Sequence, residues 1–278
     1  MIWNFKRRSL DLTRRGVIMG VLNVTPDSFS DAGSFLDAKA AVAHALRMES
    51  EGAEIIDIGG ESTRPGAEAV EPEEELRRIV PVVEGLRARS QVIISIDTSK
   101  AIVAEAALGL GADIINDVTA LLGDPRMPEV AAKSQAGVVL MHMQGTPRTM
   151  QQNPRYKDVV AEVAEFLRQR VSVAIGYGMA ADRIVLDPGI GFGKKPDHNL
   201  ALLRSLGTLV ELGRPVLLGV SRKSFLGWLA DAPATPDRFW PGVALTSFCR
   251  EKGARIFRVH EPEPHRDALR MTEAICQG

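Results

Sequence analysis

The sequence predicts a single (β/α)8 barrel, in which eight parallel strands close on themselves and a helix follows each strand. Eight short aliphatic runs recur along the 278 residues. Their carboxyl ends, from Asn23 to His260, are on average about 34 residues apart, a length suited to one strand and one helix. The runs are apolar at successive positions, as expected of parallel strands covered on both faces. A doubly wound open sheet is the structural alternative.

Strand and helix patterns alternate along the whole chain. The predicted strands span residues 17–22, 55–58, 92–96, 114–115, 138–141, 184–186, 216–220 and 256–259. Apolar residues at helical spacing predict helices over residues 37–51, 71–88, 100–110, 127–135, 158–176, 199–212, 239–251 and 264–275. The helix over residues 71–88 opens with Pro72 and acidic residues, both of which suit a helix N-terminus.

Glycines punctuate this repeat shortly before the predicted strands, where a left-handed residue would end the preceding helix. They are Gly52, Gly111, Gly137, Gly178, Gly213 and Gly253. No linker rich in Pro, Gly or Ser and no low-complexity tract interrupts the pattern. We therefore expect one domain over residues 1–278.

Charge and hydropathy exclude several classes of protein. The 34 Lys and Arg residues balance 35 Asp and Glu residues and give a net charge of -1, which argues against binding to nucleic acid or to an anionic membrane. No apolar run approaches the roughly 20 residues that span a bilayer. Residues 1–10 lack the apolar region of a secretory signal, so we expect a cytoplasmic protein. Cys249 and Cys276 predict no structural disulfide.

Chemically capable side chains follow nearly every predicted strand. Because the strand ends of such a barrel open onto one face, we expect these side chains to form one site. The set consists of Asp57, Asp97, Asn116, Asp187, Lys223, Arg258 and His260. Basic and hydroxyl groups after the last two strands indicate an anion site. A matching ligand would carry a polar ring with several donors and acceptors at one end and an anion at the other.

Some of these motifs also have a purely structural interpretation. The loops over residues 25–33 and 59–66 could be ordinary turns rich in Gly, Pro and Ser. Asp97 could cap the helix that follows it. His142 at the end of the fifth predicted strand is more typical of a hydrogen-bonding residue than of a metal ligand, because no second ligand accompanies it at metal spacing.

The glycine-rich segment over residues 188–194 invites a P-loop interpretation. That motif requires glycine at its first position and Ser or Thr at its last, and this chain has Pro188 and Lys195 there. The segment does not match a dinucleotide-binding fingerprint either. For the basic residues after the last two strands, a solvated surface cluster remains an alternative to an anion site.

Eight sequence blocks resemble those of dihydropteroate synthases, and they stand in the same order. They are NVTPDSFSD at 23–31, GGESTRPG at 59–66, SIDTSK at 95–100, IIND at 114–117, LMHMQG at 140–145, LDPGIGFGK at 186–194, SRKS at 221–224 and RVH at 258–260. The resemblance extends from Met19 to His260 and implies a (β/α)8 TIM barrel. It also implies the family's reaction in folate synthesis, which joins 4-aminobenzoate to 6-hydroxymethyl-7,8-dihydropterin diphosphate and gives 7,8-dihydropteroate and diphosphate. A reduced pterin diphosphate has the polar ring and the anion that the strand ends lead us to expect.

The resemblance assigns a role to each matched residue. The pterin site would comprise Asp97, Asn116, Met141, Asp187, Phe192, Gly219, Lys223 and Arg258. The 4-aminobenzoate site would comprise Phe29, Thr63, Arg64, Pro65, Phe192, Ser221 and Lys223. The diphosphate would meet Asn23, Arg258 and His260, with Asn23 also close to Mg²⁺. The catalytic residues would be Asp31, Asp97, Lys223 and Arg258.

Family properties also imply a homodimer, two mobile loops and competition between 4-aminobenzoate and sulfonamides. Phe29 and Asp31 would belong to the first loop and residues 63–65 to the second. The clearest departure from the family pattern is the segment Phe-Trp-Pro-Gly-Val at 239–243, where members usually keep small residues near the dimer surface. This departure leaves the dimer packing open and does not affect the site.

Two other functions are compatible with a pterin pocket. A barrel that passes a methyl group from methyltetrahydrofolate to a corrinoid shares the carboxylates and the amide, but it has no reason to keep the SRKS and RVH blocks for a diphosphate. A non-catalytic pterin-binding protein would keep the pocket and lose the loop residues, whereas this chain retains Phe29, Asp31, Thr63 and Arg64.

Overall fold

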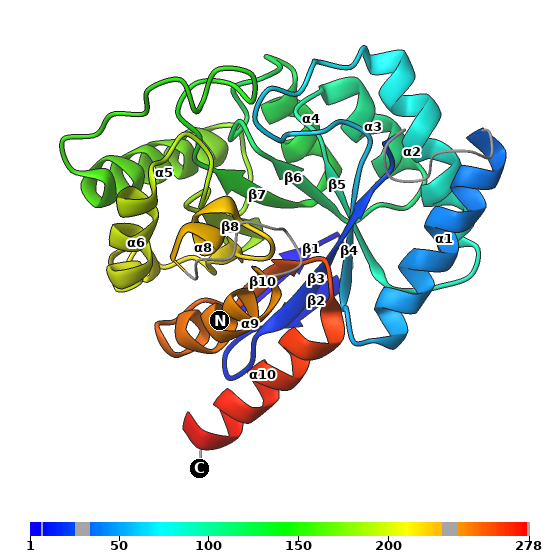
Figure 1. The fold of residues 1–278 in the computed structure, drawn as a ribbon. Coiled ribbons are helices and arrows are strands. Elements are labelled where there is room, and N and C mark those ends of the chain that lie inside the picture. Colours follow the sequence, from blue (N-terminus) through cyan, green and yellow to red (C-terminus); the bar gives the residue numbers. More distant parts are fainter. Residues whose placement is uncertain (7, 26–33, 230–237, 277–278) are drawn as a thin grey trace.

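The structure is a computed structural model that describes residues 1–6, 8–25, 34–229 and 238–276. These residues place eight parallel strands in one sheet in the order β8-β7-β6-β5-β4-β3-β10-β9. A parallel bridge between Leu186 and Val216 connects β8 to the segment that leads into β9, and so closes the sheet into a barrel. Figure 1 shows the helices arranged around the central strands. The predicted (β/α)8 TIM barrel is confirmed, and the open sheet is not found.

The barrel strands are short and almost completely buried, because helices cover them outside and side chains fill the interior. They are β3 (Val17–Asn23), β4 (Ile55–Gly59), β5 (Ile93–Asp97), β6 (Ile114–Asp117), β7 (Gly137–Met141), β8 (Ile184–Asp187), β9 (Leu217–Gly219) and β10 (Ile256–Val259). Each corresponds to a predicted strand, with both ends within two residues of the predicted limits.

The helices follow the prediction with two differences. They are α1 (Ser34–Ser50), α2 (Pro72–Arg87), α3 (Ala101–Gly109), α4 (Met127–Ser134), α5 (Val159–Gly176), α6 (Pro196–Arg204), α7 (Leu206–Val210), α8 (Ser224–Leu229), α9 (Phe239–Glu251) and α10 (Pro262–Cys276), with a short 3-10 helix at Ala181–Arg183. The helix predicted over residues 199–212 is divided at Ser205, whose φ of -100° and ψ of 26° are not α-helical. The helix α8 follows the seventh barrel strand and was not predicted.

The glycine prediction is confirmed at five positions and wrong at one. Gly52, Gly111, Gly178, Gly213 and Gly253 have positive φ. At the remaining position, Gln135 adopts the left-handed conformation after α4, with φ of 58°, and Gly137 is already the first residue of β7. A Cβ atom on Gly137 would lie 3.0 Å from the Trp3 ring, so close packing rather than backbone conformation explains this glycine.

An N-terminal hairpin covers the end of the barrel opposite the strand carboxyl ends, and the sequence pattern did not predict it. Strands β1 (Ile2–Phe5) and β2 (Arg8–Asp11) pair antiparallel. Trp3 and Phe5 are buried in one apolar cluster with the first residues of the barrel strands, and their rings meet edge to face at 5.3 Å. The Trp3 indole N–H donates to the carbonyl of Arg183 at 2.9 Å. The hairpin therefore closes the N-terminal end of the barrel.

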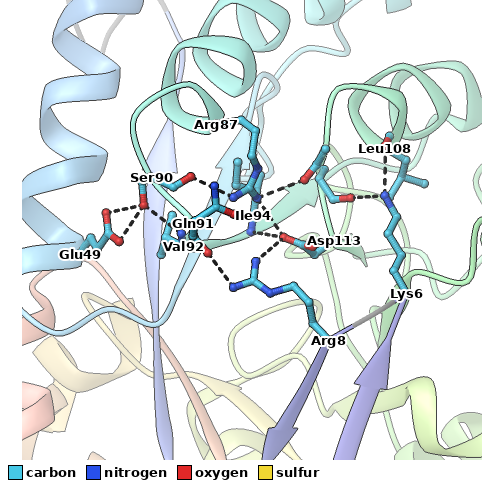
Figure 2. Close-up of polar contacts among 12 residues, drawn as sticks. Lys6, Arg8, Glu49, Arg87, Ser90, Gln91, Val92, Ile94, Leu108 and Asp113 are labelled. Carbon is cyan, nitrogen blue, oxygen red and sulfur yellow. Dashed lines mark hydrogen bonds and ion pairs between the residues drawn. The ribbon is translucent and has the colours of Figure 1, made fainter.

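Polar contacts shown in Figure 2 fasten this hairpin to the starts of β5 and β6. The buried Asp113 carboxylate accepts from the guanidinium of Arg8 at 3.3 Å and from that of Arg87 at 3.0 Å. The Lys6 ammonium donates to the carbonyl of Leu108 at the end of α3. The hairpin is therefore joined to the rest of the barrel by polar contacts with α2, α3 and Asp113 as well as by its apolar cluster. Among the described residues, no helix has the length and apolar character needed to cross a membrane.

Candidate functional site

A cavity at the carboxyl ends of the strands gathers most of the predicted site residues. About 330 Å³ of space that is continuous with solvent lies among its lining residues. Its lining consists of Thr63, Asp97, Asn116, Val118, Met141, Asp187, Gly189, Ile190, Phe192, Gly219, Lys223 and Arg258. All eight residues predicted for the pterin lie in this lining. Sequence reasoning missed Val118, Gly189 and Ile190, which are apolar loop residues without a chemical signal of their own.

A buried centre of charge lies on one wall of the cavity. The Arg258 guanidinium on β10 donates to Asp57 at 2.6 Å and to Asp97 at 2.7 Å, so it joins the ends of β4 and β5. The Asn116 amide also donates to Asp57, at 3.0 Å. One oxygen each of Asp57 and Asp97 is buried without a hydrogen-bond partner among the described residues. Because an unpaired buried carboxylate oxygen is costly, the oxygen of Asp97, which lines the cavity, favours a ligand that donates hydrogen bonds.

Burial has a strong effect on Asp97. It raises the pKa of that carboxyl to about 7, although the Arg258 charge acts in the opposite direction. Asp97 does not cap the following helix, because Lys100 occupies that position and the Ala101 N–H donates to Asp124 instead. The capping interpretation of Asp97 is therefore wrong, and its carboxylate is available to the cavity.

Asp187 and Lys223 also line the cavity. Asp187 ends β8 and accepts from the backbone N–H of Gly189 at 2.7 Å, while burial raises the pKa of its carboxyl. Burial and the neighbouring Arg258 charge lower the pKa of Lys223 to about 8, although Asp187 and Asp97 act in the opposite direction. The Lys223 ammonium lies 4.4 Å from the centre of the Phe192 ring, a cation–π distance. The buried Lys223 ammonium therefore interacts both with the Phe192 ring and with the charges of Asp187 and Asp97.

The end of β10 places His260 among positive charges. Its Nδ1 lies 3.1 Å from the Ser221 hydroxyl. Burial lowers the pKa of His260 to about 3, and the charges of Arg222, Arg258, Lys223 and Arg64 act in the same direction. These neighbouring cations disfavour a positive charge on the imidazole. For the same reason they favour a bound anion beside His260.

The second predicted loop is only partly at the cavity. Thr63 lines it, whereas Arg64 and Pro65 line a second hollow, which is open to solvent, together with Arg78. Ser221 is buried beside His260 and does not line the cavity. Thr63, Phe192 and Lys223 therefore line one cavity, whereas Arg64, Pro65 and Ser221 do not line it.

Asn23 ends β3, half-buried between the neighbouring strands β4 and β10. Phe29 and Asp31 lie outside the described residues. In the described ranges, no group of three or more His, Cys, Asp and Glu side chains could hold a metal ion. Mg²⁺ is often bound by only one or two protein oxygens together with water and substrate phosphates, so the Asn23 amide oxygen is compatible with that ion.

The pterin binding enzyme family matches residues 19–260 of this chain, whose barrel encloses carboxylates, an amide and buried cations at its strand ends. A dihydropteroate synthase of Neisseria meningitidis serogroup B is 47% identical, with 99% of this chain and 97% of the relative covered. This chain belongs to the dihydropteroate synthases, transferases of folate biosynthesis.

Two solved structures agree with this membership. The Yersinia pestis dihydropteroate synthase with a sulfonamide drug complex has a TM-score of 0.93 and 44% identity, covering 100% of both chains. The Xanthomonas albilineans dihydropteroate synthase with 4-aminobenzoic acid has a TM-score of 0.91 and 46% identity, covering 98% of this chain and 96% of that one. The family predicted from the eight sequence blocks is confirmed, and the methyltransferase alternative is set aside.

Proposed function

We propose that this chain condenses 6-hydroxymethyl-7,8-dihydropterin diphosphate with 4-aminobenzoate to give 7,8-dihydropteroate and diphosphate. Membership of the dihydropteroate synthases supports the reaction. The observation that carries it is the single cavity lined by all eight residues expected for the pterin, in which a buried Asp97 oxygen has no partner among the described residues. A polar ring with several N–H donors would satisfy that oxygen.

The pterin would lie among the charged side chains that line the cavity. Its ring N–H and exocyclic amine would donate to the carboxylates of Asp187 and Asp97, and the Lys223 ammonium would donate to ring acceptors. Asn116 offers an amide that can donate and accept. Met141, Phe192 and Gly219 would line the ring, and Arg258 would cover it.

The 4-aminobenzoate would bind where Thr63, Phe192 and Lys223 meet. Arg64 and Pro65 on the second loop, Ser221 and Phe29 would complete this site once the loops close around both substrates. The X. albilineans synthase solved with 4-aminobenzoic acid, 46% identical to this chain, supports a subsite for that compound. Ordered binding would follow, with the pterin and diphosphate binding first.

The diphosphate would bind at Asn23, Arg258 and His260, where the surrounding cations favour an anion. Asn23 would lie close to Mg²⁺, which when bound supplies further charge neutralisation to the diphosphate. His260, neutral in the free protein, would donate a hydrogen bond, and the bound anion would raise its pKa.

The reaction requires no nucleophile on the protein. The bond between the pterin methylene carbon and the diphosphate oxygen breaks, and its electron pair leaves with the diphosphate. The amine nitrogen of 4-aminobenzoate forms the new C–N bond and loses a proton to water. The catalytic residues would be Asp97, Lys223, Arg258 and Asp31. The Asp97 carboxylate would stabilise the developing positive charge on the ring, and Arg258 would stabilise the leaving group.

We further propose a cytoplasmic, single-domain homodimer. Large apolar side chains are exposed on α9 and α10, and these helices pack together. They are Trp240, Phe248, Met271 and Ile275, with exposed fractions of 71%, 39%, 65% and 74%. Exposed apolar side chains of this size favour a protein interface. Sulfonamides should compete with 4-aminobenzoate, as the sulfonamide complex of the Y. pestis synthase suggests.

The reaction is tested by measuring diphosphate release from the pterin diphosphate, with and without 4-aminobenzoate. Release should depend on 4-aminobenzoate and be accompanied by dihydropteroate in equal amount. Binding of the pterin without release of diphosphate would show a non-catalytic pterin-binding protein. Full activity at saturating sulfonamide and low 4-aminobenzoate would show that the pocket excludes the drug.

A further inference from the structure

Lys194 is a buried cation that the proposed mechanism does not use. Its side chain is 3% exposed, and it follows the glycine-rich loop after β8. Its ammonium lies 2.9 Å from the carbonyl oxygen of Phe192, 3.0 Å from that of Gly189 and 3.3 Å from that of His142. Burial lowers the pKa of Lys194 to about 7, although the Asp187 charge acts in the opposite direction. The carbonyl acceptors favour the protonated form, because an unpaired buried charge is very costly.

The imidazole of His142 completes the set. Its Nδ1 lies 2.9 Å from the Lys194 ammonium. Burial lowers the pKa of His142 to about 3, with the Lys194 charge acting in the same direction, so the neutral ring can accept at Nδ1. The ring is held edge to face against Phe166, with centroids 4.9 Å apart. Lys194 thus ties the loop after β8 to the end of β7.

The loop is wrapped closely around this ammonium. Gly189, Gly191 and Gly193 all have positive φ. A Cβ atom on Gly189 would lie 1.9 Å from the His142 carbonyl oxygen, and one on Gly193 would lie 2.4 Å from the Gln144 carbonyl oxygen. Only glycine allows this approach of the two backbones, which turns the carbonyl groups toward the lysine.

The same loop carries one group of the proposed substrate sites, Phe192, and contacts another, Asp187. The Gly189 N–H donates to the Asp187 carboxylate, and the Gly189 carbonyl accepts both from Lys194 and from the Phe192 N–H at 3.0 Å. The Phe192 ring lines the cavity beside Lys223. The Lys194 side chain itself does not line the cavity, so it can act on a substrate only through these neighbours.

We propose that Lys194 is a positioning residue: its ammonium holds the loop over residues 188–194 against the end of β7, and thereby sets the Phe192 ring and the Asp187 carboxylate for the pterin and 4-aminobenzoate. This inference deepens the proposed function and rests on it. A substitution of Lys194 should therefore weaken the binding of both substrates in a protein that is still folded.

The test compares Lys194→Met with Lys195→Met, a matched control in which the neighbouring exposed lysine is changed. Steady-state kinetics are measured well below the unfolding temperature of each variant. Lys194→Met should raise the KM of both substrates about tenfold, because a small displacement of positioning groups is enough for that effect. Lys195→Met should stay within about twofold of the original chain. Lys194→Arg, which keeps the charge, should recover part of the loss.

A double-mutant cycle separates positioning from general weakening of the fold. If Lys194 acts through Phe192, then Lys194→Met should raise the aminobenzoate KM much less in a Phe192→Leu background than in the original chain. Multiplicative effects in the cycle, or unchanged KM values in folded Lys194→Met, would overturn the proposal.

Should Lys194→Met fail to fold, His142→Phe decides the question. This variant removes the Nδ1 acceptor and keeps the three carbonyl acceptors, so it should raise both KM values in the same direction with a smaller effect. Unchanged KM values in this variant would then refute the positioning role. An original chain that releases no diphosphate in the presence of 4-aminobenzoate would instead refute the proposed function.

Discussion

Burial changes the pKa of a single residue in the proposed site, Lys223. Its ammonium is buried beside the Phe192 ring, and its pKa is lowered to about 8. Lys223→Met should remove a charged hydrogen bond to the pterin worth roughly 1.5 to 3 kcal/mol and reduce turnover at least about tenfold.

The pH profile checks the same assignment. If the protonated Lys223 is required, kcat/KM of the original chain should fall as pH rises above about 8, where the ammonium loses its proton. Initial rates between pH 6 and 10 measure this. Unchanged turnover by a folded Lys223→Met protein would contradict the role of this lysine.

At the scale of elements, one ionic group anchors the second loop. Lys100, just before α3, contacts Glu61 at the start of that loop and Glu75 on α2. Glu61 also accepts from the N–H of Val70, which lies between the loop and α2, at 3.2 Å. The loop that carries Thr63 is therefore flanked on both sides by contacts to one charge cluster. Loss of Lys100 should affect both stability and the position of this loop.

Lys100→Met leaves the fully buried Glu75 without its cation and should destabilise the protein by about 3 to 5 kcal/mol. The aminobenzoate KM should rise more than the KM of the pterin diphosphate, because the second loop serves the aminobenzoate. Adding Glu75→Gln should recover stability, measured by denaturant unfolding, without recovering the KM. Equal changes in the two KM values would argue against an anchoring role.

A second contact between elements responds to pH. His265 on α10 is buried, with its Nδ1 2.7 Å from the Thr246 hydroxyl on α9. Burial lowers its pKa to about 4. Between that value and about 6.5, the unfolded chain binds a proton that the folded chain does not, so stability falls as pH falls through this window.

His265→Gln removes this titration. The stability of the original chain relative to the variant should decrease by about 2 kcal/mol from pH 7.5 to pH 5, because only the original chain gains this proton on unfolding. Urea unfolding at the two pH values measures the difference, and other histidines contribute equally to both proteins. A difference that does not change with pH would show that His265 does not titrate in this range.

At the scale of the whole molecule, the barrel has a functional end and a closed end. Trp3 is fully buried under the closed end, whereas Ile2 on the same strand is 53% exposed. Trp3→Ala should reduce stability by about 3 to 5 kcal/mol, as large-to-small changes in a core do, and Ile2→Ala should have little effect. Thermal unfolding together with substrate KM values tests this. A large rise in KM for folded Trp3→Ala would show that the two ends are coupled.

Local patterns along the chain were enough to predict the fold class, the approximate limits of the barrel strands and the residues at their ends. Strand and helix periodicity is local, and a parallel barrel brings all strand ends to one face, so the neighbourhood of Asp97, Asn116, Asp187 and Lys223 followed from topology alone. The hairpin at residues 2–11 escaped prediction because its two strands are only four residues long and carry no distinct pattern.

Which of these groups pair with one another became known only from the folded chain. Arg258 binds Asp57, 201 residues away along the chain, and Lys194 is buried against carbonyl groups of two separate loops. Such contacts depend on side-chain conformation and on the close approach of backbones, which the order of residue types does not specify. The altered pKa values of Asp97, His260 and Lys223 have the same origin, because desolvation is a property of the packed molecule and not of the local sequence.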